Sequence, residues 1–86
     1  MKLWLRVKIK DKLIQNELYE NNLSMSRQNY EQTLREVCEK MDISTPVSLS
    51  VHFKHLVKFN TVKYTKDDFI DRENFDVLEV ENCTEL

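Results

Sequence analysis

Hydrophobic and polar residues alternate at the start of the chain. Leu3, Leu5, Val7 and Ile9 share one side of the alternation. The other side holds Lys2, Trp4, Arg6, Lys8 and Lys10. A period of two predicts a strand with one buried and one solvated face. We expect a tight reversal at Asp11-Lys12, although it lacks the glycine that such turns favour, and a returning strand over residues 13–20.

The hydrophobic period lengthens after Ser24. Five apolar side chains then recur at helical spacing: Tyr30, Leu34, Val37, Cys38 and Met41. A hydroxyl at Ser24 or Ser26 can accept a hydrogen bond from a first-turn amide. The pattern therefore predicts an amphipathic helix over residues 26–41, and Pro46 prevents the chain from continuing as a helix.

The second half of the chain predicts three more strands. Residues 47–53 alternate from Val47 to Phe53, which indicates a third half-buried strand. The remaining predicted elements are a strand at 61–65, a helical turn at 66–70 and a strand at 75–81. In the last of these, Val77 faces outward. The order is β-β-α-β-β-turn-β in a single α+β domain over residues 1–86.

Two segments resemble the ubiquitin-like, or β-grasp, family. Met1–Val7 is similar to the first ubiquitin strand, with an outward aromatic residue at position 4. Thr65–Ile70 followed by Val77–Val80 resembles the short helix and last strand of that family. The resemblance implies a mixed sheet packed on one helix, and a binding module. The segments TPVSLSVH and KDDF also resemble short bacterial proteins, a group from which no activity can be borrowed.

Departures from ubiquitin limit what the resemblance implies. The segment Asn82–Leu86 has no Gly-Gly tail, so we do not expect conjugation or sulfur transfer. Glu79 stands where ubiquitin carries an apolar recognition residue, so ubiquitin receptors are not expected to bind.

Composition excludes several functions. The 86 residues contain no glycine, which removes the P-loop, the dinucleotide GxGxxG motif, the EF-hand loop and the GxSxG elbow. Cys38 and Cys83 are too few for a disulfide framework or an iron–sulfur cluster. We find no signal-peptide pattern and no run apolar enough to span a membrane. These features favour a cytoplasmic location.

Candidate catalytic and metal-binding residues are few. Cys38 with His52 or His55 could form a nucleophilic dyad, but Cys38 lies on the apolar stripe, where burial raises a thiol pKa. Residues three apart on a strand point to opposite faces, so the two histidines could hold a metal together only if the chain turned between them. No third ligand has a fitting spacing. We therefore predict no cofactor, no metal and no enzymatic activity.

The leading hypothesis is a protein-binding module that uses the open sheet face and an edge strand. Its partner would be an unidentified protein or a second copy of the chain. Trp4 is the expected anchor, with Val77 beside it, because tryptophan offers a large rigid contact area. The expected contact residues are Trp4, Arg6, Lys8, Ser50, His52 and Val77. Arg6 and Lys8 should pair with acidic side chains of the last strand if that strand is a neighbour.

Nucleic-acid binding is the alternative hypothesis. It would use a basic patch formed by Lys54, His55, Lys58 and Lys63. The hypothesis is less favoured because 13 basic residues face 15 acidic ones, giving a net charge of −2. The strands also lack the aromatic pattern of nucleic-acid-binding sheets.

Overall fold

The computed structural model describes residues 1–84. Its elements are β1 (Lys2–Ile9), β2 (Lys12–Glu20), α1 (Arg27–Lys40), α2 (Ser50–Phe59), β3 (Thr61–Thr65), the 3₁₀ turn η1 (Lys66–Asp68) and β4 (Val77–Asn82). Glu85 and Leu86 lie outside the described residues. They are the last two residues of the segment in which no Gly-Gly tail was expected.

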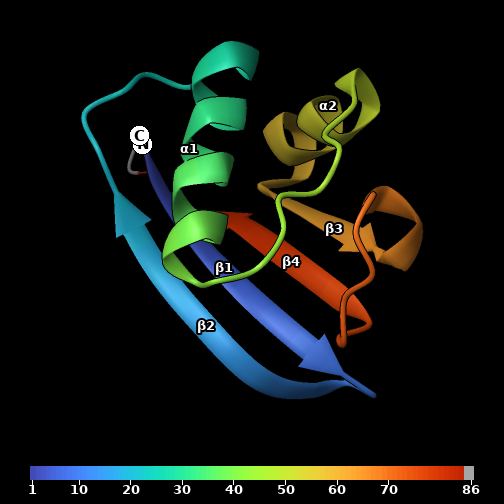
Figure 1. The fold of residues 1–86 in the computed structure, drawn as a ribbon. Helices are drawn as coiled ribbons and strands as arrows, with labels where there is room; N and C mark the ends of the chain where they lie inside the picture. Colours follow the sequence, from blue (N-terminus) through green and yellow to red (C-terminus); the bar gives the residue numbers. More distant parts are fainter. Residues whose placement is uncertain (85–86) are drawn as a thin grey trace.

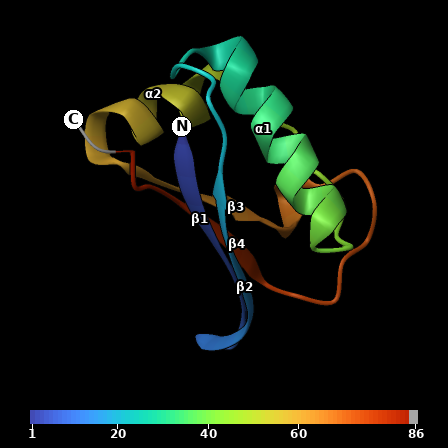
Figure 2. The same ribbon diagram turned by 90° about the vertical axis from the view of Figure 1, so that its left-hand side faces the viewer.

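The four strands form one sheet in the order β2-β1-β4-β3 (Figure 1). All three strand pairs are antiparallel. Both helices lie on the same face of the sheet, and none of the helices described in residues 1–84 lies on the other face (Figure 2). The sheet therefore has one core face and one face open to solvent.

The core lies between this sheet and the helices. Strands β1 and β4 contribute fully buried side chains such as Leu5, Val7 and Leu78. The apolar stripe predicted for the first helix is buried along its whole length. Ser26 caps the helix, since its hydroxyl accepts a hydrogen bond from the Asn29 N–H at 3.2 Å. The predictions for β1, β2 and α1 are confirmed.

The strand expected at residues 47–53 is wrong, because this segment leads into helix α2. Val47 and Val51, expected to face the core, are 42% and 63% exposed. Leu56 is fully buried instead, and the Phe53 ring lies 5.9 Å from that of Tyr30. The alternation ends at Phe53, and a helix is the conformation that brings Phe53 and Leu56 to the same side.

The sheet also differs from the mixed sheet on one helix that the β-grasp resemblance implied. The first and last strands are neighbours, as expected, but they run antiparallel. Two helices rather than one cover the core face. The α+β class is confirmed.

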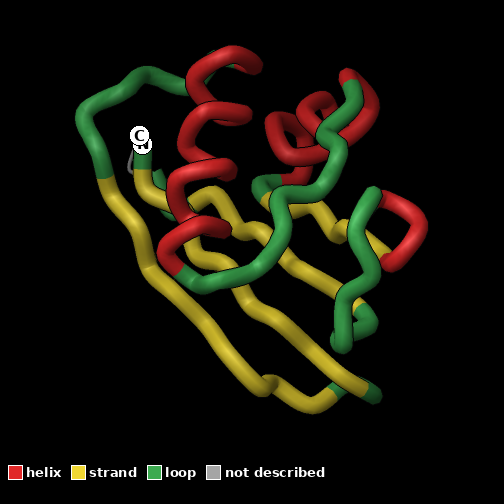
Figure 3. The backbone as a smooth tube through the Cα atoms, in the orientation of Figure 1, coloured by secondary structure: helices red, strands yellow, loops and turns green. Residues whose placement is uncertain are grey.

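Two long loops lie at the end of the core where α1 finishes (Figure 3). They cover residues 41–49 and 69–76. The Ser44 N–H donates to the Glu73 carboxylate at 2.7 Å, and the Val47 N–H donates to the Asp68 carbonyl at 2.7 Å. The first bond joins the two loops, and the second joins the loop before α2 to η1, so α2 has a defined starting point.

The β1–β2 hairpin turns without glycine, one residue earlier than predicted. Lys10 and Asp11 both have positive φ values, 50° and 63°. Two left-handed residues define the turn type that matches the twist of paired strands. Each such residue carries a steric cost, because its Cβ crowds the backbone.

Replacing Asp11 with glycine is therefore expected to stabilise the fold by about 1 kcal/mol. Lys12→Gly is the matched control, since Lys12 begins β2 and glycine in a strand costs about 0.5–1 kcal/mol. Urea denaturation measures both variants. A lower stability for Asp11→Gly than for the wild type would contradict the turn geometry.

Candidate functional site

The open face of the sheet is centred on Trp4. The strand register places Leu18 of β2 on one side of Trp4 and Glu81 of β4 on the other. The indole Nε1–H donates to the Asn16 side-chain oxygen at 3.3 Å. The Arg6 guanidinium lies over the indole, 4.4 Å from the ring centre. The indole is thus held on two sides while part of it remains in solvent.

A charge cluster surrounds Glu79 in the middle of the same face. Glu79 is only 8% exposed, and three cations approach its carboxylate. Lys8 lies at 3.0 Å, Arg6 at 3.1 Å and Lys63 at 3.8 Å. A second contact joins Arg6 to Glu81 at 3.4 Å. The expected pairing of β1 cations with acidic residues of the last strand is confirmed.

The cluster determines the titration of Glu79. Burial on its own raises the pKa of this carboxyl. The hydrogen bond and charge of Lys8, followed by the charges of Arg6 and Lys63, outweigh burial and lower the pKa below its ordinary value. Glu79 is therefore ionised at neutral pH and fixes the position of Arg6.

The structure brings together only part of the predicted contact set. Trp4, Arg6, Lys8 and Val77 lie on strands of the sheet, at positions that the register assigns to the open face. Ser50 and His52 lie on α2, which packs on the opposite face of the sheet. Their expected place on the open face depended on the third strand, and is wrong for that reason.

The neighbour expected for Trp4 is also different. Val77 pairs with Lys8, four residues along β1 from Trp4. Leu18 is the apolar neighbour that sequence reasoning missed, and its side chain is 53% exposed. The register shifts between Val7 and Lys8, so that β2 contains one extra residue. Counting back from the turn without this bulge would place Glu17 opposite Trp4.

Two of the four residues of the alternative hypothesis line a groove at the other edge of the sheet. His55 and Lys63 line a hollow of about 510 Å³ between α2 and β3, together with Val51 and Val62. Lys54 and Lys58 are exposed on α2. Of the four residues, only His55 and Lys63 line this hollow, and Lys63 also contacts Glu79 on the open face.

The candidate dyad does not form. Burial raises the pKa of the Cys38 thiol to about 12, so the thiolate is scarce at neutral pH. His52 accepts a hydrogen bond from the Leu49 N–H at 2.8 Å through Nδ1, and His55 Nδ1 lies 2.6 Å from the Thr61 carbonyl oxygen. Neither histidine bonds to Cys38 within residues 1–84.

The two histidines lie on a helix rather than a strand, and both line the groove between α2 and β3. No group of three or more potential metal ligands occurs among the described residues.

Buried hydroxyl groups form a separate polar cluster in the core. The Tyr30 and Tyr64 hydroxyls lie 2.8 Å apart, and the Ser48 hydroxyl lies 2.9 Å from that of Tyr64. Burial raises the pKa of both tyrosines. These groups satisfy one another and stay protonated, so the cluster joins α1, β3 and the loop before α2.

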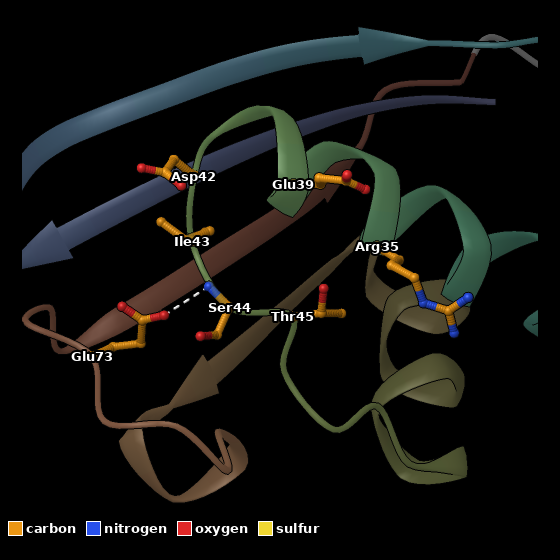
Figure 4. Close-up of a pocket in the computed structure, with 7 residues that line it drawn as sticks. All are labelled: Arg35, Glu39, Asp42, Ile43, Ser44, Thr45 and Glu73. Carbon is orange, nitrogen blue, oxygen red and sulfur yellow. Dashed lines mark hydrogen bonds between the residues drawn. The ribbon is translucent and has the colours of Figure 1, made fainter.

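A polar hollow of about 460 Å³ lies where α1 meets the two long loops (Figure 4). Arg35 and Glu73 lie at opposite ends of it, and its side chains do not converge on one point. The Glu73 carboxylate already accepts a hydrogen bond from the Ser44 N–H. The side chains that line this hollow are therefore not arranged to bind one ligand jointly.

Comparisons with protein-family models, with curated proteins and with solved structures find no match. The fold defines a small α+β domain with a four-stranded antiparallel sheet and two helices on one face. The β-grasp resemblance stays a prediction without a structural counterpart. No helix within residues 1–84 has the length and hydrophobicity to cross a membrane.

Proposed function

We propose that this chain is a non-catalytic protein-binding module whose binding surface is the open sheet face around Trp4. The observation that carries the proposal is the Trp4–Arg6 stack on a face that no helix of the described part of the chain covers. Tryptophan and arginine are the residue types most enriched among those that dominate binding energy. A cytoplasmic location belongs to the same proposal and agrees with two free cysteines.

Preorganisation supports this assignment. Glu79 holds Arg6, Arg6 covers one side of the indole, and Asn16 bonds its Nε1–H. Because these side chains are already ordered in the free chain, a partner would lose little conformational entropy by contacting them. The exposed Leu18 beside the indole extends the apolar centre, and charges of both signs form its rim.

Paired baits test the proposal. The wild type, Trp4→Ala and Ile70→Ala are each used to capture proteins from the source cells, with detection by mass spectrometry. Ile70 is the matched control, because it is 90% exposed and lies on the loop after η1. We expect a protein retained by the wild type and Ile70→Ala but reduced at least about tenfold on Trp4→Ala. Equal retention on all three baits would contradict the proposal.

The salt dependence of binding separates the alternative function. Nucleic-acid binding through Lys54, Lys58 and Lys63 would weaken steeply with added salt, because bound phosphates release counterions. Binding through Trp4 should respond little. A nucleic acid bound at low salt and unaffected by Trp4→Ala would favour the alternative.

A further inference from the structure

The outer edge of β2 presents backbone groups that have no hydrogen-bond partner among residues 1–84. Residues of antiparallel strands alternate between pairs that bond to each other and pairs whose N–H and C=O point away. The Asn21 N–H donates to the Met1 carbonyl at 2.9 Å, which fixes the alternation between β2 and β1. It follows that Asn16, Leu18 and Glu20 direct their N–H and C=O groups to the free edge. No side chain of residues 1–84 bonds to these groups.

The opposite edge of the sheet is protected. The Asn82 N–H donates to the Asn60 carbonyl at 2.8 Å, so by the same alternation Thr61, Lys63 and Thr65 of β3 face outward. The ring of His55 lies 2.6 Å from the Thr61 carbonyl oxygen. The carboxylate of Asp68 accepts the Thr65 N–H at 2.8 Å. Both ends of the β3 edge are thus occupied, while the longer β2 edge remains open.

Exposed apolar side chains gather along the same strand. Leu13, Ile14 and Leu18 are 48%, 52% and 53% exposed. A long edge strand with unprotected backbone groups and exposed apolar side chains is a template for pairing with another strand. Proteins that remain monomeric usually interrupt such an edge with charged side chains, proline, a bulge or a covering loop. The bulge of β2 lies opposite Val7 and Lys8, and residues 15–20 pair with β1 in regular register.

We propose that two copies of this chain associate through their β2 strands, antiparallel about a two-fold axis at Leu18, to form a continuous eight-stranded sheet. In this register Leu18 opposes Leu18 and each Asn16 opposes Glu20, so all three outward residues of each copy are paired. A shift that places Asn16 opposite Leu18 would bring Glu17 opposite Glu17, and like charges in direct opposition are destabilising.

Charge complementarity supports the same register. Glu17 of one copy lies opposite Tyr19 of the other. Lys40 lies over the Tyr19 ring, 5.7 Å from its centre, and 3.6 Å from Glu17 of its own chain. Each Lys40 would therefore lie between two Glu17 carboxylates. The two-fold axis repeats this contact on the other side of the interface.

Sedimentation equilibrium tests the dimer with the purified chain from about 10 µM to about 1 mM. We expect the apparent mass of the wild type to rise from 10.4 kDa toward twice that value. Leu18→Lys places two lysines opposite each other and should raise the dissociation constant at least about tenfold. Ile70→Lys is the control for added charge at an exposed apolar site and should behave as the wild type.

Amide hydrogen exchange tests the dimer on the wild type alone, so the result does not depend on whether a variant folds. The N–H groups of Asn16, Leu18 and Glu20 should exchange slowly at high concentration and quickly on dilution, whereas that of Lys63 should not respond. A chain that stays monomeric throughout, or a dimer that Leu18→Lys leaves intact, would overturn the proposal. If the dimer does not form, the capture experiment with Trp4→Ala still tests the proposed function, because it detects partners that do not bind the β2 edge.

Discussion

Replacing Leu56 with alanine is expected to lower the free energy of unfolding by about 3 kcal/mol. Leu56 is the one fully buried side chain of α2. Its removal would leave a cavity between the helix and the sheet, and large-to-small changes in a core cost about 2–5 kcal/mol. Urea denaturation gives the value directly.

Val51→Ala is the matched control for Leu56→Ala. Val51 lies on the same helix but is 63% exposed, so its truncation should change stability by less than about 0.5 kcal/mol. The pair also separates the helix from the strand first expected here, in which Val51 would face the core. A large loss for Val51→Ala with a small one for Leu56→Ala would contradict helix α2.

Glu79→Gln is expected to destabilise the fold by about 2 kcal/mol at neutral pH. The variant keeps the size of the side chain but removes the negative charge that faces Arg6, Lys8 and Lys63. Arg6 would then be held partly buried without this counter-charge. Glu31→Gln is the control, because its ion pair with Arg27 is on the helix surface and exposed pairs contribute about 0–1 kcal/mol.

The acid sensitivity of the fold should change with the same substitution. The pKa of Glu79 is lowered by folding, so its contribution is complete above the pKa of the unfolded chain. That contribution is lost as the pH falls through the lower, folded-state pKa. Stability measured between about pH 7 and pH 2 should therefore fall less for Glu79→Gln than for the wild type. Parallel pH profiles would show that the cluster does not stabilise the fold.

The regular first half of the chain could be predicted from its sequence. The alternation of β1 and the helical stripe of α1 each bury one side of a single element. The local hydrophobic period is therefore enough to predict the type of element. The sequence leaves the capping residue open between Ser24 and Ser26, and the structure assigns it to Ser26. The pairing of Arg6 with Glu79 required one further assumption, that the first and last strands are neighbours, and the structure confirms it.

Residues 47–59 show where periodicity fails. Val47, Leu49 and Val51 alternate as in a strand, yet all three are exposed. The signal for the helix lies in Phe53 and Leu56, together with Asn60, which ends the helix in a left-handed conformation with φ of 59°. A short apolar run does not distinguish a strand from a helix, and tertiary contacts decided the conformation.

The proposed binding surface could be predicted only in part for a similar reason. Trp4, Arg6 and Lys8 follow from one strand, whereas the neighbours that complete the surface depend on register. The β2 bulge has no sequence signal that we can identify, and it is what brings Leu18 beside Trp4. Ser50 and His52 were placed on the surface through a strand that does not form.

The most direct test of the proposed binding surface uses the fact that Trp4 is the only tryptophan in the chain. Incorporation of 5-fluorotryptophan gives a single ¹⁹F resonance that reports on the indole alone. When a captured partner is added to saturation, we expect this resonance to shift or broaden as the open face is covered. A resonance that stays unchanged while the partner is fully bound would contradict the assignment of the open sheet face as the binding surface.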